Sequence, residues 1–228
     1  MTDKIDQTYF SIGQRILMLL FNCIPFLHVA GTVVAILLPW HDLWQRIAAG
    51  FIFLYLAPPI AARLTKSMLN IKEGKISLGS KDFFTWWALS NVQMLFCRLP
   101  ILEELLRLIP GLYTLWLRLW GAKIGRLTYW GAGTMILDRQ FIDIGNYVVL
   151  GAGVRLNPHV IALNEKGSME LLLATVKIGD NSVVGGYSLL TAGTEIAEGE
   201  CTRAMLASPP FIKWAGGKRT DKGSQDQQ

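Results

Sequence analysis

A six-residue period runs through the second half of this 228-residue chain, beginning after Gly121. An aliphatic or aromatic residue recurs at every sixth position, often followed by glycine, and a small or β-branched residue commonly lies four positions later. The large residues are Ile124, Trp130 and Ile136, then Ile144, Leu150 and Leu156, then Ile178, Val184 and Leu190, with Ile196 beginning a fourth set that degenerates. This period predicts a β-coil of triangular cross-section, in which each hexapeptide supplies one short strand and one turn and three hexapeptides complete a coil.

Stacked coils need covered ends, because no coil can bury its large side chains without neighbours. We expect the aromatic-rich residues before Ile124 to cover one end and the segment Ala207–Trp214 to cover the other. One long interruption, Ala162–Lys177, separates the second and third sets of repeats. It predicts an excursion of the chain away from the coil.

The spacing resembles that of the hexapeptide-repeat acyltransferases, whose domain is a left-handed parallel β-helix, over roughly Leu119–Trp214. The run Trp116–Gly125 also looks like the lead-in to this domain in membrane-associated members and in related domains of some peptide-synthetase-like enzymes. The resemblance implies a left-handed β-helix acyltransferase domain over residues 121–214, and a homotrimer with sites between protomers.

The first 80 residues predict a helical hairpin that anchors the chain in a membrane. Of the whole chain, 51% is hydrophobic and only 17% is charged, which is unlike an ordinary soluble enzyme. Ile16–Trp40 carries no formal charge and is long enough to span a bilayer, whereas Ile47–Ala62 is marginal. Basic residues precede the first run and follow the second, so both ends of the hairpin are expected in the cytoplasm, at the inner membrane. The prolines in these runs leave a re-entrant or interfacial hairpin open, and a cleaved signal peptide is a third alternative.

Residues 81–120 alternate aromatic and aliphatic side chains with charged ones, interrupted at Pro100 and Pro110. We expect short amphipathic helices lying in the membrane interface. They can also cap the coil that follows, and the two roles are compatible. The three cysteines have no zinc or disulfide spacing, so we expect no metal and reduced, buried thiols facing the cytoplasm.

His159 is the candidate catalytic residue. It ends the second coil, directly before the long interruption, and the resemblance places the family's catalytic histidine at this juncture. A hydroxyl or amine attacks a thioester poorly until a base takes its proton, and imidazole titrates near neutral pH. His28 and His41 lie in or beside the first apolar run and are interpreted as packed or interfacial. The residue that orients His159 is left open among Asn157, Glu165, Glu170 and a backbone carbonyl.

The resemblance also implies a groove for the pantetheine arm of an acyl-CoA or acyl-carrier-protein donor. The residues at the matching positions are Gly185, Gly186, Ala192, Gly193, Ala204 and Ser208, with Lys213 placed to meet phosphate. Ala207-Ser208-Pro209-Pro210 departs from the family's Gly-x-Pro-Ala-like element, so a carrier-protein thioester is as plausible as CoA. The polar tail, residues 215–228, is expected to be disordered.

Together these features predict a membrane-bound acyltransferase that uses His159 as general base. Its acceptor would be a hydroxyl or amine on an amphiphilic molecule or a saccharide, such as a lipid-linked sugar, an exopolysaccharide precursor or a lipid headgroup. The net charge of +5 fits membrane lipid or a phosphate-bearing donor without nucleic acid. The alternative is a non-enzymatic scaffold, a membrane-attached β-helix that organises a biosynthetic complex. A carbonic-anhydrase-like zinc site would need more histidines than the repeat holds, and a nucleotidyltransferase would need a nucleotide domain before it.

Overall fold

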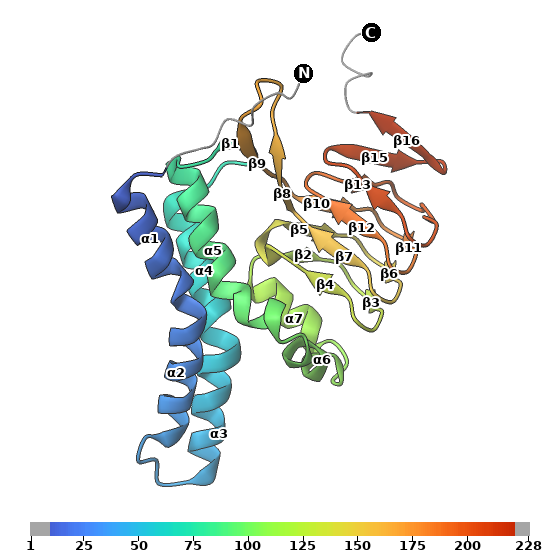
Figure 1. The fold of residues 1–228 in the computed structure, drawn as a ribbon. Coiled ribbons are helices and arrows are strands. Elements are labelled where there is room, and N and C mark those ends of the chain that lie inside the picture. The colour runs from blue at the N-terminus through green and yellow to red at the C-terminus, as the bar shows by residue number, and fades with distance from the viewer. Residues whose placement is uncertain (1–9, 222–228) are drawn as a thin grey trace.

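The computed structural model describes residues 10–221, with helices in the first half and short strands in the second (Figure 1). The helices are α1 (Ile12–Asn22), α2 (Ile24–Leu37), α3 (Leu43–Phe51), the π-helical turn η1 (Ile52–Leu56), α4 (Ala57–Leu69), α5 (Lys81–Arg98), α6 (Ile101–Arg107) and α7 (Leu112–Leu119).

The strands after Gly121 stack into three parallel sheets, which confirms the coil predicted from the six-residue period. The first sheet holds β2 (Lys123–Ile124), β5 (Ile142–Ile144), β10 (Val176–Ile178), β13 (Glu195–Ile196) and β15 (Ile212–Ala215). The second holds β3 (Tyr129–Trp130), β6 (Val149–Leu150) and β11 (Val183–Val184). The third holds β4 (Met135–Ile136), β7 (Arg155–Asn157), β12 (Leu189–Thr191) and β14 (Ala207–Ser208). Each coil therefore contributes one strand to each sheet, apart from a single bridge in place of a strand in the fourth coil.

The large residues of the period fill the interior of the coil. Ile136, Leu150 and Leu156 have no exposed surface, and neither do Val184 and Leu190. The pairing places equivalent residues of successive coils directly above one another, because Ile124 pairs with Ile144, Ile144 with Ile178 and Ile178 with Ile196. Burial of each large side chain in these stacks stabilises the fold by on the order of 1.5–3 kcal/mol.

The coil extends further than the period predicts. After Ile196, where the repeat degenerates in sequence, β14 still pairs with β12 and β15 pairs with β13. β16 (Lys218–Asp221) then folds back antiparallel on β15, so the expectation of disorder from residue 215 is wrong as far as residue 221. Residues 222–228 lie outside the described part of the chain. A backbone hairpin with Gly216 and Gly217 at positive φ closes this end.

The N-terminal helices form two continuous rods that are long and apolar enough to cross a bilayer, Ile12–Leu37 and Leu43–Leu69. Pro25 and Pro58-Pro59 lie at helix starts, where the missing N–H costs little, so they interrupt neither rod. Large apolar side chains point outward along α2 and α3, among them Phe26 and Trp44 at 72% and 77% exposed. Cys23 is also exposed, as is Cys201 on the coil, so the expectation of buried thiols is wrong for both.

The helices α5 to α7 pack onto the coil, as the capping interpretation predicts. Phe83, Trp86, Phe96, Trp116 and Trp120 belong to one core cluster with the interior residues of the coil. α6 and α7 lie beside the first coil, and α5 connects them to the helical rods (Figure 1).

The interruption of the repeat is a β-hairpin, formed by β8 (His159–Leu163) and β9 (Met169–Leu173). β9 also pairs antiparallel with β1 (Gly74–Ser77), which lies within the first 80 residues. The prediction of a helical hairpin over the first 80 residues is therefore wrong at Gly74–Ser77, which form a strand. This three-stranded sheet ties the excursion to the helical half of the chain, and Glu73 adds hydrogen bonds to Thr175, one to its backbone N–H and one to its hydroxyl, each 2.7 Å long.

Candidate active site

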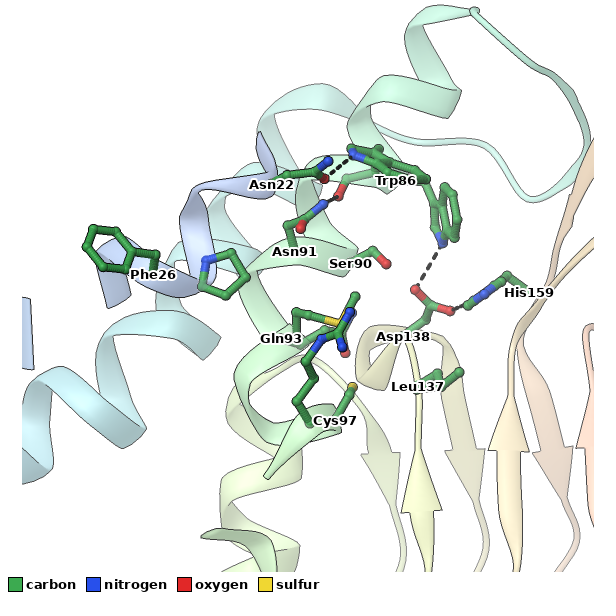
Figure 2. A pocket seen from close by; sticks show the side chains of 14 residues that line it. Asn22, Phe26, Trp86, Ser90, Asn91, Gln93, Cys97, Leu137, Asp138 and His159 are labelled. Carbon is green, nitrogen blue, oxygen red and sulfur yellow. Dashed lines mark hydrogen bonds and ion pairs between the residues drawn. The ribbon is translucent and has the colours of Figure 1, made fainter. Parts of the chain in front are cut away.

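His159 lies at the base of the β8–β9 hairpin, at the corner between the third and first sheets. Its Nδ1 is hydrogen-bonded to Oδ2 of Asp138, and the other carboxylate oxygen of Asp138 accepts a 3.0 Å hydrogen bond from Nε1 of Trp86 (Figure 2). The Trp86 ring meets the imidazole edge to face, with ring centroids 4.8 Å apart. Asp138 and Trp86 together hold the imidazole in one orientation.

The carboxylate of Asp138 controls the charge of His159. Burial by itself lowers the pKa of His159, but the coulombic attraction of Asp138 and the hydrogen bond between them outweigh it, so the pKa lies above its ordinary value. The side chain of Asp138 is 1% exposed, whereas that of His159 is 22% exposed. When Nδ1–H donates a hydrogen bond to Asp138, Nε2 is the unprotonated nitrogen of the neutral ring. No described residue hydrogen-bonds to Nε2.

A buried ion network around Arg139, the next residue in the sequence, fixes the position of Asp138. Asp138 itself has a left-handed backbone, a conformation that Asp tolerates better than most residues. The guanidinium of Arg139 is fully buried and pairs with Glu103 of α6, while Gln93 of α5 accepts hydrogen bonds from its side chain and its backbone N–H. Rings of Phe96, Trp116 and Trp120 surround the guanidinium at 5.5–5.8 Å from their centroids. This network ties the turn that carries Asp138 to α5 and α6.

The imidazole opens into a cavity of about 780 Å³ between the coil and the helices. His159, Asp138 and Leu137 line its coil side, and Asn22 and Phe26 line the opposite side (Figure 2). The wall between them comes from α5: Trp86, Trp87, Ser90, Asn91, Gln93, Met94, Cys97 and Arg98. The cavity therefore runs from the candidate base to a helix that is long and apolar enough to lie in a bilayer.

Asp138 is the orienting residue that sequence reasoning missed. The three side chains considered from sequence do not fill this role: Glu165 is exposed at the hairpin, Glu170 lies on β9, and the buried Oδ1 of Asn157 has no hydrogen-bond partner among residues 10–221. Asp138 precedes His159 by 21 residues, close to the 20-residue spacing of equivalent positions in the first two coils, such as Ile136 and Leu156. An acidic residue in the last hexapeptide of the first coil is the signal that could have identified it, because the end of this coil stacks on the corner that carries His159.

The residues implied for the donor divide between two corners of the coil. Ala192 and Gly193 stack on the His159 corner, since Gly193 donates its backbone N–H to the carbonyl of Ala174, and Ala174 donates to that of Pro158. Gly185, Gly186 and Ala204 stack on the next corner, between the second and third sheets. A single chain therefore does not bring all the implied residues together.

Two of these residues have interior roles. Ala192 is fully buried against Leu172 and Ala174, and Ser208 is buried with its hydroxyl bonded to Nε1 of Trp214. Neither offers a surface to a donor. Lys213 is exposed and pairs in register with Glu195 on the outward face of the first sheet, away from the cavity.

Gly185 has a structural reason for lacking a side chain. A Cβ there would lie 2.4 Å from the backbone of Arg203 and Ala204 in the next coil. We expect Gly185→Ala to lower the free energy of unfolding by about 1–3 kcal/mol through overpacking. Thermal unfolding checks this, with Gly13→Ala in α1 as the matched control, because nothing lies within 4 Å of a Cβ at Gly13. Equal stability of the two variants would contradict this close packing.

The pair of His159 and Asp138 gives a pH prediction. A general base must be unprotonated, so with His159 as the base predicted from the sequence, the rate of the expected acyl transfer should fall on the acid side of the pKa of His159, which Asp138 raises. In Asp138→Asn the charge is gone and burial lowers that pKa, so the acid limb moves to lower pH. The maximal rate also falls, by about 10- to 100-fold, because a hydrogen bond to a charged group is lost. The pH profile of labelled acyl transfer measures both, and an unmoved acid limb would show that another group titrates.

Comparison with known proteins gives structural neighbours only. No family model and no curated protein matches the sequence. A hexapeptide-repeat-containing acetyltransferase from Vibrio cholerae is similar with 13% identity and a TM-score of 0.34, over 68% of this chain and 97% of its own. The serine acetyltransferase of Neisseria gonorrhoeae is similar with 16% identity and a TM-score of 0.23, over 88% of this chain and 78% of its own, and its structure with serine gives 14% and 0.22, over 93% and 84%. No TM-score reaches 0.5, so these likenesses by themselves assign no activity to the chain.

Proposed function

We propose that this chain is a membrane-bound acyltransferase of the left-handed β-helix type, with His159 as its general base. The donor is an acyl-CoA or an acyl-carrier protein, and the acceptor is a hydroxyl or amine on an amphiphilic or saccharide molecule. The observation that carries the proposal is the pair of His159 and Asp138 at one end of a cavity whose other end is formed by α2.

The chemistry follows from the arrangement of the pair. The acceptor's O–H or N–H gives its proton to Nε2 of His159 as the acceptor oxygen or nitrogen bonds to the thioester carbonyl carbon. Asp138 accepts the Nδ1–H and stabilises the imidazolium that forms. The carbonyl then re-forms, the C–S bond breaks, and the imidazolium returns the proton to the leaving thiolate. Acylated acceptor and free thiol are the products, with His159 neutral again.

The shape of the cavity supports an amphiphilic acceptor. Phe26 and Pro25 of α2 lie at the end opposite His159, and Ser90 and Asn91 provide polar groups along α5. A molecule whose apolar part stays beside α2 can therefore present a hydroxyl or amine to Nε2. A lipid-linked sugar, an exopolysaccharide precursor and a lipid headgroup meet this description. The basic residues that flank the apolar rods support a cytoplasmic position for the coil at the inner membrane.

A trimer would bring the divided donor residues together. In one chain, Gly186 and Ala204 lie on a different corner from His159, so a second protomer is needed to place them beside the imidazole. The exposed side chains support association through the corner between the second and third sheets, where Tyr187 and Met205 are 70% and 75% exposed. The first sheet is charged on its outward face instead, with ion pairs such as Lys177 with Glu195.

One observation favours the scaffold alternative: Ala192 and Ser208, two of the residues expected to contact the donor, are buried. Isothermal titration of the detergent-solubilised chain with CoA, and capture of acyl-carrier protein on it, separate the two functions. An acyltransferase binds at least one of these donors, and we expect that result. Binding of neither would favour the scaffold and overturn the proposal.

A further inference from the structure

A second cavity, of about 910 Å³, lies between α6–α7 and the first coil, away from the His159 corner. Its walls come from the end of α6, from α7 and from the turn between β2 and β3. His159 and Asp138 do not line it, so any ligand of this cavity is distinct from the substrates at His159.

The cavity is basic. Arg107, Arg118 and Arg126 line it, and no described Asp or Glu does. Glu103 and Glu104 form ion pairs with Arg107, whereas within the described part of the chain Arg118 donates only to the backbone carbonyls of Ile124 and Gly125. Arg126 is exposed, and its side chain has no ion pair among the described residues. Two guanidinium charges therefore remain for an anion.

Two buried polar atoms in the wall lack partners. They are Nε of Arg107, whose side chain is only 9% exposed, and the hydroxyl of Thr128. Buried donors without partners are costly and rare, so each calls for an unseen partner. An oxyanion that accepts from Arg107 Nε and the Thr128 hydroxyl satisfies both.

The rim of the same cavity is apolar. Ile109, Leu115 and Leu127 line it with 58%, 57% and 77% of their surface exposed. The apolar surface continues onto Leu105 of α6 and Leu108 directly after it, which are 48% and 76% exposed. A water-soluble anion would leave this surface uncovered, but acyl chains would cover it.

We infer that this cavity binds the anionic headgroup of a membrane phospholipid, with the acyl chains lying along the apolar face of α6 and α7. The phosphate meets Arg118 and Arg126, and its oxygens accept from Arg107 and Thr128. Bound lipid holds the first coil against the bilayer surface at the end where α6 and α7 cap it (Figure 1). The inference rests on the membrane attachment proposed above, but binding here needs no acyl transfer.

Thermal unfolding of the full chain in neutral detergent tests the inference without an assay of turnover. The added probes are dioctanoyl phosphatidylglycerol, dioctanoyl phosphatidylcholine and inorganic phosphate. We expect phosphatidylglycerol at a hundredfold excess over its Kd to raise the unfolding midpoint by about 5 °C, because a ligand that binds only the folded state stabilises it. We expect little or no rise with the other two.

Arg126→Gln should lose most of the rise with phosphatidylglycerol, since the exposed Arg126 supplies charge and no packing. Lys213→Gln is the matched control, an exposed cation at the opposite end of the coil, and should keep the full rise. An equal rise with phosphatidylcholine, a full rise with phosphate alone, or an unchanged response in Arg126→Gln would overturn the inference. The donor-binding test of the proposed function is independent of all three outcomes.

Discussion

Replacing His159 with alanine is expected to reduce acyl transfer by about 10²–10⁴-fold, the contribution typical of a general base. The residual rate would come from the positioning of donor and acceptor, which the substitution leaves in place. The measurement is transfer of a radiolabelled acyl group to the membrane fraction, under saturating donor. The loss should appear in kcat, because Nε2 acts on the reacting proton and not on binding of the donor.

A second variant separates chemistry from folding. Alanine leaves the buried carboxylate of Asp138 with Trp86 as its only partner among the described residues, which itself costs stability. His159→Asn keeps an amide N–H to donate toward Asp138 but has no base, so it should lose activity to the same extent with its unfolding midpoint little changed. His41→Ala, in the exposed loop between the rods, is the matched control. A near-wild-type rate in His159→Asn would reject His159 as the base.

Removing the carboxylate of Glu103 is expected to destabilise the fold by about 3–5 kcal/mol, because it leaves the fully buried charge of Arg139 uncompensated. Burial disfavours the charged guanidinium, but the attraction of Glu103 more than offsets this and raises the pKa of Arg139 above its ordinary value. Glu103→Ala therefore loses the interaction that makes a buried guanidinium tolerable. Chemical denaturation of the detergent-solubilised chain measures the change.

The exposed pair of Lys123 and Asp143 is the control for this prediction. Its side chains are 82% and 40% exposed, and a pair of this kind is worth at most about 1 kcal/mol, so Asp143→Asn should change stability little. Glu103→Leu with Arg139→Met removes both buried charges and should cost less than the sum of the single changes. Equal effects of Glu103→Ala and Asp143→Asn would contradict the network described here.

The coil could be predicted from sequence because its signal is local and repeated. Each hexapeptide places a large side chain at the same phase, so Ile144, Leu150 and Leu156 predict their own interior positions before any contact between distant residues is known. The position of His159 follows for the same reason, since it closes a coil. The apolar rods are equally local signals of length and composition.

The rest depends on contacts between residues far apart in the chain. Asp138 reaches His159 only because the ends of the first and second coils stack on one corner. β1 pairs with β9, about a hundred residues later in the chain, and no local sequence pattern predicts this pairing. The fourth coil has weak periodicity but is templated by the strands of the third, to which its backbone hydrogen-bonds. Tertiary contacts therefore supplied the orienting residue, the extra strand and the longer coil.

The central claim is that His159, at the end of a cavity that begins at α2, is the general base for acyl transfer from a thioester donor to an amphiphilic acceptor. The most direct test is mass spectrometry of lipids and surface glycans from cells that lack the gene and are complemented with either the wild-type chain or His159→Asn. The account predicts a lipid or glycan that carries an acyl group only with the wild-type chain. Identical lipid and glycan profiles from the two complemented strains would contradict it.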